Sequence, residues 1–477
     1  MSNITTSSAG KRITALLDEN SFVEIGAKVT ARATDFNLKQ NETPSDGVIT
    51  GYGVIDGNPV YVYSQDASVL GGSVGEMHAK KIANLYDLAM KTGAPVIGLI
   101  DSAGLRLQEA ADALNAFGEI YMKQTLASGV IPQITAVFGN CGGGLALIPT
   151  LTDFTFMEEK KAKLFVNSPN ALDGNTEAKC DTASAAFQSE EAGIVDVVAD
   201  EMSILAQIRE LITMLPANNE EEADAVCTDD LNRICADLAN CVGDTSIALT
   251  QIADDNRFFE VKSAYAKDMV TGFMKLDGIT VGAVANRTEV YDDDGQVSEK
   301  FDAVLSVRGA KKAAEFVKFC DAFEIPVLTL TNVKGYAATK CTERGIAKAV
   351  AELTYAFANA TVPKVNVVIG KAFGSAYVAM NSKAIGADMT FAWPDAEIGS
   401  MDAKLAAKIM YEGQGADVIN EKAAEYAKLQ TSAESAAKRG YVDTIIDAEE
   451  TRKYVIGAFE MLYTKSEDRP SKKHGTV

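Results

Sequence analysis

The chain has 477 residues, of which 47% are apolar and 23% charged, and its formal net charge is −21. This length exceeds one ordinary hydrophobic core and indicates two or three domains. The acidic balance disfavours binding to nucleic acid or to anionic membranes, since both depend on clustered Lys and Arg. The longest apolar runs have the length of a strand, so we expect no membrane insertion.

Cysteine and histidine usage limits the chemistry further. Seven cysteines lack metal-ligand spacing and indicate reduced thiols in the cytoplasm, and no apolar segment of a secretory signal follows the first charges. Cys227, Cys235 and Cys241 have a spacing that fits one helix, and we expect no metal site. Only His78 and His474 are available. A mechanism that uses histidine as its base would therefore depend on His78.

In chain order, the first half alternates between strands and helices. A strand is predicted at residues 60–66, an amphipathic helix at 79–93, a buried strand at 95–101, a helix at 118–129 and a strand at 131–139. Short apolar strands separated by helices are typical of α/β units with crossover connections and parallel pairing.

Glycine-rich sequence follows two of these strands. GNCGGGLALIPTLTDF occupies residues 139–154, and DSAGLRLQEAADA begins at residue 101. Backbone N–H groups at the start of a helix are unpaired, and glycine lets an oxygen atom approach them, so such a turn can form an oxyanion hole worth about 3 kcal/mol per donor. Alternatively, the glycines serve only close packing of strand on helix. Neither stretch matches a dinucleotide-binding or P-loop motif.

The second half repeats the first. AKKIANLYDLAMKTGAPVIGL from residue 79 matches AKKAAEFVKFCDAFEIPVLTL from residue 310, and the same offset of 231 relates Gly104 to Gly335 and Gly143 to Gly374. Several matched segments in the same order indicate duplication. The polar, acidic stretch at residues 215–226 reads as a linker. We therefore expect two domains, residues 1–225 and 226–477, each with its own pair of glycine-bearing turns.

Taken together, the two halves resemble the carboxyltransferase family of biotin-dependent acyl-CoA carboxylases and decarboxylases, which includes propionyl-CoA carboxylase beta chains and methylmalonyl-CoA carboxyltransferases. The resemblance runs from about residue 13 to residue 463. Its most specific stretches are DGVITGYGVIDG, LGGSVGEMHAKKI, SGVIPQITAVFGNCGGG, LTDFTFM and AYVAMNSKAIGADMTFAWPDAEI, which begin at residues 46, 70, 128, 151 and 376.

The resemblance implies two tandem crotonase-like spiral domains of βαβ-type units. It assigns the first half to acyl-CoA and the second half to biotin, with the site between halves of different subunits in a homo-oligomer, most commonly a hexamer. Gly143 and Gly144 would hold the thioester oxygen of the acyl-CoA enolate, and Ser375 and Ala376 the ureido oxygen of biotin. The acyl-CoA pocket would comprise Ala103, Gly104, Gly142 and Gly143, and the biotin pocket Gly335, Tyr336, Gly374, Ser375 and Ala376.

The implied reaction moves CO₂ between N1 of biotin and the α-carbon of an acyl-CoA, and needs no histidine base. Biotin would arrive on a separate carrier protein, because Lys91 in AMKT sits on a predicted helix and reads as a surface lysine. Further partners would be a biotin carboxylase or a membrane decarboxylase subunit.

The chain departs from the family pattern mainly in the half assigned to biotin. Relatives usually read DVPGFLPGTAQEHGG where residues 332–345 read NVKGYAATKCTERG, GGAY where residues 374–377 read GSAY, and MGAEGA where residues 401–406 read MDAKLA. In the first half, DSGGARIQEG has become DSAGLRLQEA.

Two other functions stay open at this point. A crotonase-type hydratase or hydrolase would need an acid or base over the acyl pocket, for which Glu109 is the candidate. A catalytically silent scaffold in a carboxylase complex is the other. Ordinary structural roles are expected for His78, a hydrogen-bonded residue at a helix start, and for Cys141, a small packing residue. The paired lysines that open matched helices are expected in solvent: Lys80, Lys81, Lys311 and Lys312.

Overall fold

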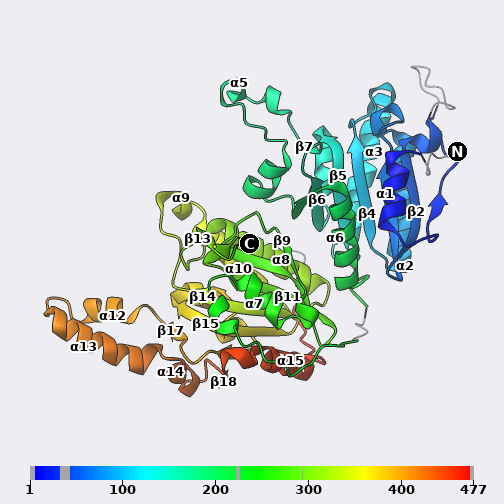
Figure 1. Cartoon of the computed structure of the whole chain (residues 1–477). Helices are drawn as coiled ribbons and strands as arrows, with labels where there is room; N and C mark the ends of the chain where they lie inside the picture. Colours follow the sequence, from blue (N-terminus) through cyan, green and yellow to red (C-terminus); the bar gives the residue numbers. More distant parts are fainter. Residues whose placement is uncertain (1–5, 33–42, 222–225, 293, 473–477) are drawn as a thin grey trace. The chain divides into compact units, whose positions relative to one another are not determined.

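A computed structural model describes residues 6–32, 43–221, 226–292 and 294–472. The chain divides into two compact units, unit 1 from Met1 to Glu222 and unit 2 from Ala223 to Val477. The predicted domain boundary between residues 225 and 226 adjoins residues 222–225, which lie outside the described residues. Each unit is built on its own sheet (Figure 1).

The sheet of unit 1 runs in the order β1-β2-β3-β4-β5-β6-β8, with β7 also paired to β5. A hairpin of β2 and β3 is antiparallel, whereas the pairs from β3 to β8 are parallel. The strands are β1 (Val23–Ile25), β2 (Val48–Ile55), β3 (Asn58–Gln65), β4 (Val96–Ser102), β5 (Gln133–Gly142), β6 (Phe154–Glu158), β7 (Lys163–Phe165) and β8 (Val197–Ala199).

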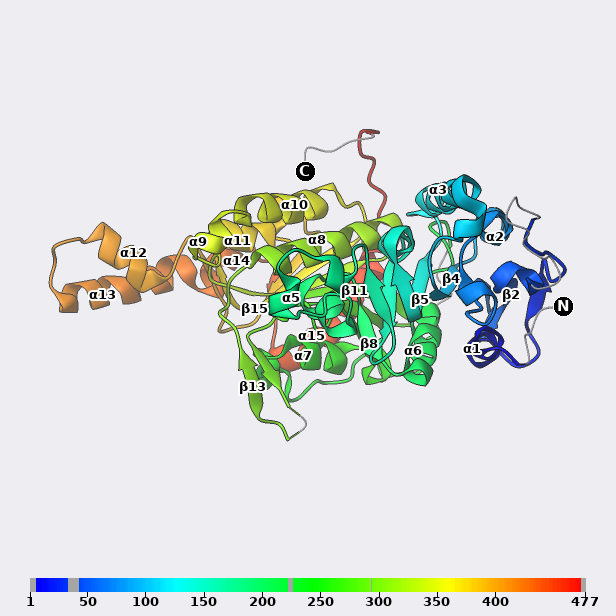
Figure 2. The ribbon, with the colours of Figure 1, turned by 90° about the horizontal axis from the view of Figure 1, so that it is seen from above.

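Helices cover both faces of this sheet. Helices α2 (Glu76–Thr92) and α3 (Ala110–Ala127) lie together on one face, and α1 (Ser8–Leu16) and α6 (Glu201–Met214) on the other (Figure 2). The inner face of α2 carries apolar residues at helical spacing, Ala79, Ile82, Leu85, Tyr86 and Ala89, and all are buried. Two short helices, α4 (Leu147–Thr150) and α5 (Asn175–Ala178), follow β5 and β7.

Unit 2 repeats this topology strand for strand. Its sheet has the order β18-β16-β15-β14-β11-β10-β9, with β17 paired to β15. The strands are β9 (Phe258–Val261), β10 (Met269–Leu276), β11 (Ile279–Asn286), β14 (Val327–Val333), β15 (Lys364–Phe373), β16 (Met389–Ala392), β17 (Glu397–Gly399) and β18 (Thr444–Ile445). Strands β4 and β14, like β5 and β15, have bounds that differ by the offset of 231 read in the sequence.

The helices of unit 2 follow the same plan, with one addition. Helices α8 (Val307–Ala322) and α10 (Ile346–Asn359) cover one face, and α7 (Thr245–Ile252) and α15 (Thr451–Leu462) the other. A hairpin of α12 (Ala403–Met410) and α13 (Ala416–Tyr426) projects from the body of unit 2 (Figures 1 and 2). The remaining elements are α9 (Lys340–Glu343), α11 (Gly374–Ala379), α14 (Ala433–Lys438) and the ribbon of β12 (Glu289–Tyr291) with β13 (Val297–Lys300).

The elements predicted for the first half are present, with boundaries within three residues of those predicted except at the start of one helix. The helix predicted at 79–93 is α2, which ends where Gly93 adopts a left-handed φ of 64°. The helix predicted from residue 118 begins at Ala110 instead, because Ala113, Ala116 and Phe117 extend its buried face toward the N-terminus. Within the described residues, no helix is long and apolar enough to cross a membrane.

Candidate functional site

In unit 2 the chain makes a tight turn where β15 runs into α11. Gly374 has a left-handed φ of 64°, and a Cβ there would lie 3.4 Å from the carbonyl oxygen of Ser400. Residues other than glycine rarely adopt this backbone conformation, so the turn strongly favours glycine. It leaves Ser375 exposed and buries Ala376.

This turn forms one wall of a cavity of about 540 Å³ in unit 2. The five residues predicted for biotin, Gly335, Tyr336, Gly374, Ser375 and Ala376, all line it. Four segments of unit 2 supply the walls: the residues before α8, the loop after β14, the end of β15 with α11, and the residues that lead into α12. Sequence reasoning missed eight lining residues: Val304, Lys334, Lys371, Phe373, Ser400, Met401, Asp402 and Leu405.

Three polar side chains that line this cavity, those of Tyr336, Lys334 and Asp402, form hydrogen bonds or ion pairs. The Tyr336 hydroxyl donates to Ser375 Oγ at 2.7 Å. Lys334 Nζ lies 3.3 Å from an Asp302 carboxylate oxygen, and Asp402 caps α12 by accepting from two backbone N–H groups of that helix. The cavity therefore combines hydroxyl and ammonium donors with the apolar side chains of Phe373, Met401 and Leu405.

Unit 1 contains the matching turn, where β5 meets the short 3₁₀ helix η5 (Gly143–Ala146). Gly143 has the same φ of 64° as Gly374, and no atom lies within 4 Å of the position of its Cβ. A Cβ on Gly142 would lie 2.6 Å from the Phe165 ring, so that residue must also be glycine. The Tyr121 hydroxyl donates to the carbonyl of Gly144, which anchors the turn on α3.

The loop after β4 lies beside this turn. A Cβ on Gly104 would lie 3.5 Å from the carbonyl oxygen of Gly142, and the Ala103 N–H donates to the Gly71 carbonyl at 2.8 Å. An isolated parallel bridge joins Val74 to Leu105, and its counterpart in unit 2 joins Leu305 to Tyr336. The structure thus brings the four residues predicted for acyl-CoA into one region of unit 1. The loop after β4 is fixed by the same kind of bridge as the loop after β14 in unit 2.

In unit 1, charged residues next to the loop after β4 form a buried network. Arg106 pairs with Asp46 at 2.5 Å and with Glu109 Oε1 at 2.8 Å, and all three side chains are buried. Glu109 Oε2 accepts the backbone N–H of Glu76 at 2.6 Å. Both carboxylate oxygens of Glu109 are therefore engaged, one with Arg106 and one with the start of α2, which leaves the acid–base role considered for this residue without support.

His78 has a structural role, as expected. Its Nδ1 lies 3.0 Å from the Asp46 carbonyl oxygen and its Nε2 lies 3.2 Å from Gln65 Nε2. Burial and the nearby positive charge of Arg106 lower the pKa of His78 well below its usual value, so the ring stays neutral.

The expectation that four paired lysines are solvated is wrong for two of them. Lys81 and Lys312 are buried, whereas their neighbours Lys80 and Lys311 are exposed. Lys81 Nζ donates to the Ser45 carbonyl at 2.9 Å, and also to Ser45 Oγ and the Val48 carbonyl. Lys312 Nζ donates to the carbonyls of Lys262, Tyr265 and Met269 at 2.7–2.9 Å. In each unit, one buried ammonium thus ties α2 or α8 to the segment that leads into the antiparallel hairpin, β2–β3 in unit 1 and β10–β11 in unit 2.

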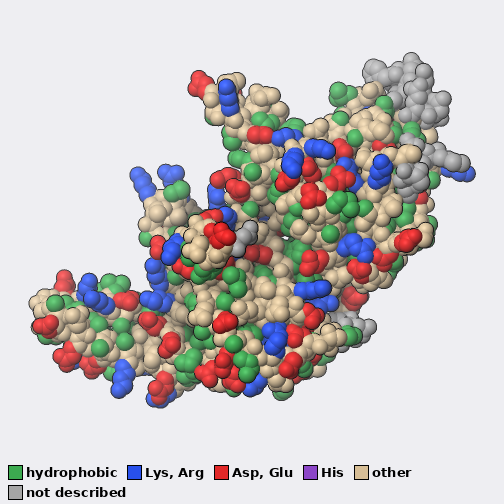
Figure 3. All heavy atoms as spheres, viewed as in Figure 1, with side chains coloured by type: hydrophobic (Ala, Val, Ile, Leu, Met, Phe, Trp, Pro, Cys, Tyr) green, Lys and Arg blue, Asp and Glu red, His purple; other side chains and the backbone are tan. Residues whose placement is uncertain are grey.

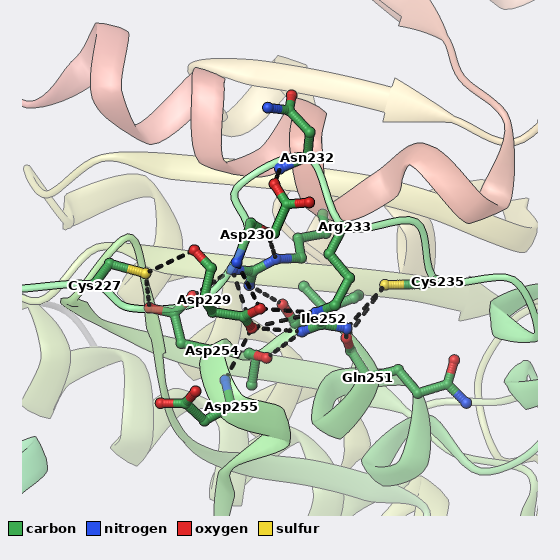
Figure 4. Close-up of polar contacts among 12 residues, drawn as sticks. Cys227, Asp229, Asp230, Asn232, Arg233, Cys235, Gln251, Ile252, Asp254 and Asp255 are labelled. Atoms are coloured by element: carbon green, nitrogen blue, oxygen red, sulfur yellow. Dashed lines mark hydrogen bonds and ion pairs between the residues drawn. The ribbon is translucent and has the colours of Figure 1, made fainter.

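Three of the seven cysteines, Cys141, Cys235 and Cys320, are buried. Cys141 is buried beside the first turn as expected, and burial raises the pKa of its thiol. The expected single helix through Cys227, Cys235 and Cys241 is wrong, because Cys227 and Cys235 lie in irregular chain (Figure 4). Arg233 fixes that segment through hydrogen bonds to Asp229 and to the Gln251 and Ala253 carbonyls. In the described ranges, no group of three or more His, Cys, Asp or Glu side chains could hold a metal ion.

Comparison with known proteins agrees with this geometry. Residues 6–477 match the family described as "Carboxyl transferase domain". The chain is 40% identical to the propionyl-CoA carboxylase beta chain of Roseobacter denitrificans, over 98% of this chain and 93% of that protein. It is 38% identical to the methylmalonyl-CoA decarboxylase subunit alpha of Veillonella parvula, over 98% and 92% of the two chains.

Among solved structures, the transcarboxylase 12S hexamer with hydrolysed methylmalonyl-coenzyme A superposes with a TM-score of 0.90 at 36% identity, over 98% of this chain and 92% of that one. The fold and its paired turns define a crotonase-like carboxyltransferase. The chain belongs to the carboxyl transferase domain family and is an acyl-CoA carboxyltransferase. The fold class and the family expected from the sequence are confirmed.

Proposed function

We propose that this chain is the carboxyltransferase component of a biotin-dependent acyl-CoA carboxylase or decarboxylase. It would move CO₂ between N1 of biotin on a separate carrier protein and the α-carbon of a short-chain acyl-CoA. The names of its relatives, a propionyl-CoA carboxylase beta chain and a methylmalonyl-CoA decarboxylase subunit, support both the acyl-CoA class and the reaction. The observation that carries the proposal is the unit 2 cavity, which is lined by all five residues expected to contact biotin.

The cavity suits a ureido ring in size and in chemistry. The cavity has a volume of about 540 Å³. There is free space at Gly335, where no atom lies within 4 Å of the position that a Cβ would take. The backbone at Ser375 and Ala376 and the hydroxyls of Tyr336 and Ser375 offer donors to a carbonyl oxygen. The apolar side chains of Phe373, Met401 and Leu405 beside these donors would pack against the ring of a bound ligand.

In the proposed mechanism, the residues of this chain act by binding and by charge stabilisation. The N–H groups of Gly143 and Gly144 hold the thioester oxygen as negative charge develops on it, and those of Ser375 and Ala376 hold the ureido oxygen. Each such donor typically lowers the barrier by about 3 kcal/mol. When bound, carboxybiotin would supply CO₂ and, once the N1–CO₂ bond has broken, a basic ureido nitrogen able to take the α-proton. The protein therefore needs no base, in keeping with the engaged state of His78 and Glu109.

The proposal includes assembly and partners. Residues 1–225 serve acyl-CoA and residues 226–477 serve biotin, and the active site forms between halves of different copies in a hexamer. Support for the hexamer comes from the assembly named for transcarboxylase 12S. The carrier protein, with a biotin carboxylase or a membrane decarboxylase subunit, completes the complex. Seven unpaired cysteines, all within the described ranges, favour a cytoplasmic location.

The decisive experiment supplies the purified chain with free biotin and a panel of malonyl-type CoAs, including methylmalonyl-CoA and malonyl-CoA. We expect the chain to form the decarboxylated acyl-CoA only when biotin is present. Chromatography of the CoA products measures this reaction. Crotonyl-CoA serves as the control for hydratase activity. Biotin-independent turnover, hydration of crotonyl-CoA, or absence of CO₂ transfer even with the native carrier would each contradict the proposal, and the last result would favour the silent scaffold.

A further inference from the structure

Two hydroxyl groups meet inside the cavity of unit 2. Tyr336 follows β14, where the bridge to Leu305 fixes its backbone, and Ser375 opens α11. Their oxygens are 2.7 Å apart, and both residues line the cavity of about 540 Å³. The contact therefore joins two segments that are far apart in the sequence.

The direction of this hydrogen bond decides what the pair can do. The tyrosine O–H donates and Ser375 Oγ accepts. A serine hydroxyl has one donor and two acceptor positions, so the hydrogen of Ser375 is not used in this contact. In the part of the chain that the structure describes, no other hydrogen bond of Ser375 Oγ is formed. Because hydrogen bonds in a chain polarise one another, a hydroxyl that accepts from tyrosine is a stronger donor to a third group.

The surrounding charges favour an oxygen acceptor with negative charge. Lys334 and Lys371 line the same cavity. The carboxylate of Asp402, which also lines it, accepts from the N–H groups of Lys404 and Leu405, so part of its charge is taken up by the start of α12. An anionic or strongly polarised carbonyl oxygen would therefore meet the ammonium of Lys371, that of Lys334, which is also paired with Asp302, and the unused hydroxyl hydrogen of Ser375.

We propose that Ser375 Oγ–H is an additional donor to the ligand oxygen bound in this cavity, and that Tyr336 is a positioning residue that orients Ser375. This inference rests on the proposed function, in which that oxygen belongs to the ureido or carboxyl group of carboxybiotin. Ser375 then binds the ligand through its side chain as well as its backbone. Its contribution is specific to the biotin half of the reaction and leaves acyl-CoA binding untouched.

The test uses the full chain with the variants Ser375→Ala, Ser375→Thr, Tyr336→Phe and the double variant Tyr336→Phe/Ser375→Ala. Binding of free biotin is titrated by ligand-observed NMR, and transfer from methylmalonyl-CoA to biotin is measured in parallel. We expect Ser375→Ala to weaken biotin binding and lower kcat/KM for biotin about tenfold, and Tyr336→Phe about threefold. Ser375→Thr keeps the hydroxyl and should retain most of the binding. The KM for methylmalonyl-CoA and the Tm should stay at wild-type values in all variants.

Three outcomes separate the inference from the function on which it rests. If the wild-type chain binds biotin and transfers CO₂ but Ser375→Ala is indistinguishable from it, the additional donor does not exist. If Tyr336→Phe still weakens binding in the Ser375→Ala background, Tyr336 does not act through Ser375. If the wild-type chain neither binds biotin nor transfers CO₂, the proposed function itself fails.

Discussion

At the scale of single residues, the buried lysines carry the clearest energetic consequence. Lys81 and Lys312 occupy matched positions, and each donates to backbone oxygens that would otherwise lose their hydrogen bonds to water. Burial lowers the pKa of Lys312 to about 7 and that of Lys81 to about 8. The nearby carboxylates of Glu260 and Asp268 oppose the lowering of the Lys312 pKa by favouring the ammonium form.

We predict that Lys312→Met lowers the Tm of unit 2, because three carbonyls, one buried and two partly buried, lose their donor at a cost of about 1–3 kcal/mol. The exposed neighbour gives the matched control, and Lys311→Met should change stability by less than about 0.5 kcal/mol. Thermal unfolding followed by circular dichroism measures both. Equal effects of the two substitutions would show that the buried ammonium contributes nothing.

The stability difference between wild type and Lys312→Met should also depend on pH. Lysine in the unfolded chain titrates near 10.5 and Lys312 in the folded chain near 7. Between these values the unfolded chain binds the additional proton, so wild-type stability rises with pH relative to the variant, by at most about 1.4 kcal/mol per pH unit. Tm differences at pH 6.5, 7.5 and 8.5 should therefore increase in that order. A difference that falls with rising pH would contradict the lowered pKa.

The sequence contained a signal for these lysines that composition alone hides. Lys81, Leu85 and Ala89 recur every four residues and share the buried face of α2, whereas Lys80 lies one position away on the exposed face. Helical periodicity could thus have separated the two. The sequence could not show which groups accept the hydrogen bonds of Lys312. These are the carbonyls of Lys262, Tyr265 and Met269, which lie 43–50 residues before Lys312 in the chain.

At the scale of elements, the repeated strand–turn–helix unit determines where ligands can approach the backbone. The turns at Gly143 and Gly374 share a φ of 64° although their surroundings differ, with open space at one and the Ser400 carbonyl 3.4 Å from the Cβ position at the other. The same backbone conformation in both copies supports a shared role in holding a carbonyl oxygen.

We predict that Gly143→Ala lowers kcat/KM for the acyl-CoA by at least about tenfold. Its Cβ would enter the open space where the ligand oxygen is expected, and the left-handed backbone would cost about 1–2 kcal/mol. Gly118→Ala is the matched control, since that glycine lies within α3 with no atom within 4 Å of its Cβ position. The control should be neutral or slightly stabilising. Steady-state kinetics with methylmalonyl-CoA distinguishes them, and unchanged kinetics in Gly143→Ala would remove this turn from the site.

Elements with strong periodicity were predictable, and elements set by tertiary contacts were not. Added to the positions of the first-half strands, the offset of 231 predicts β14, β15 and their glycine turns. The projecting two-helix hairpin of α12 and α13 could not be predicted from the repeat, because among the described residues of unit 1 the matching place after β7 holds the short helix α5 and no such hairpin. For the same reason Met401 and Leu405 were missed as lining residues of the cavity, because Met401 lies just before α12 and Leu405 lies in its first turn.

At the scale of the whole molecule, the net charge of −21 is distributed without a large basic surface on the face that Figure 3 shows. Lys and Arg side chains there alternate with Asp and Glu. Such a surface suits a protein whose anionic ligand is held locally, by backbone donors and a few lysines, rather than by a broad positive field. The cavity of unit 2, with Lys334 and Lys371 in its wall, has this character.

The projecting hairpin leads to the prediction for the assembled protein. Leu405, Ile409 and Met410 on α12 are 50–62% exposed, a cluster of large apolar side chains that association would remove from water. In the proposed hexamer this face is covered by another copy of the chain. Sedimentation equilibrium should give a mass of six times 50.7 kDa for the wild type. Ile409→Glu should shift it toward smaller species, whereas Ile409→Leu, which keeps the apolar surface, should not. A wild-type chain that stays monomeric at micromolar concentration would rule out the hexamer, and an Ile409→Glu variant with wild-type mass would place the contact elsewhere.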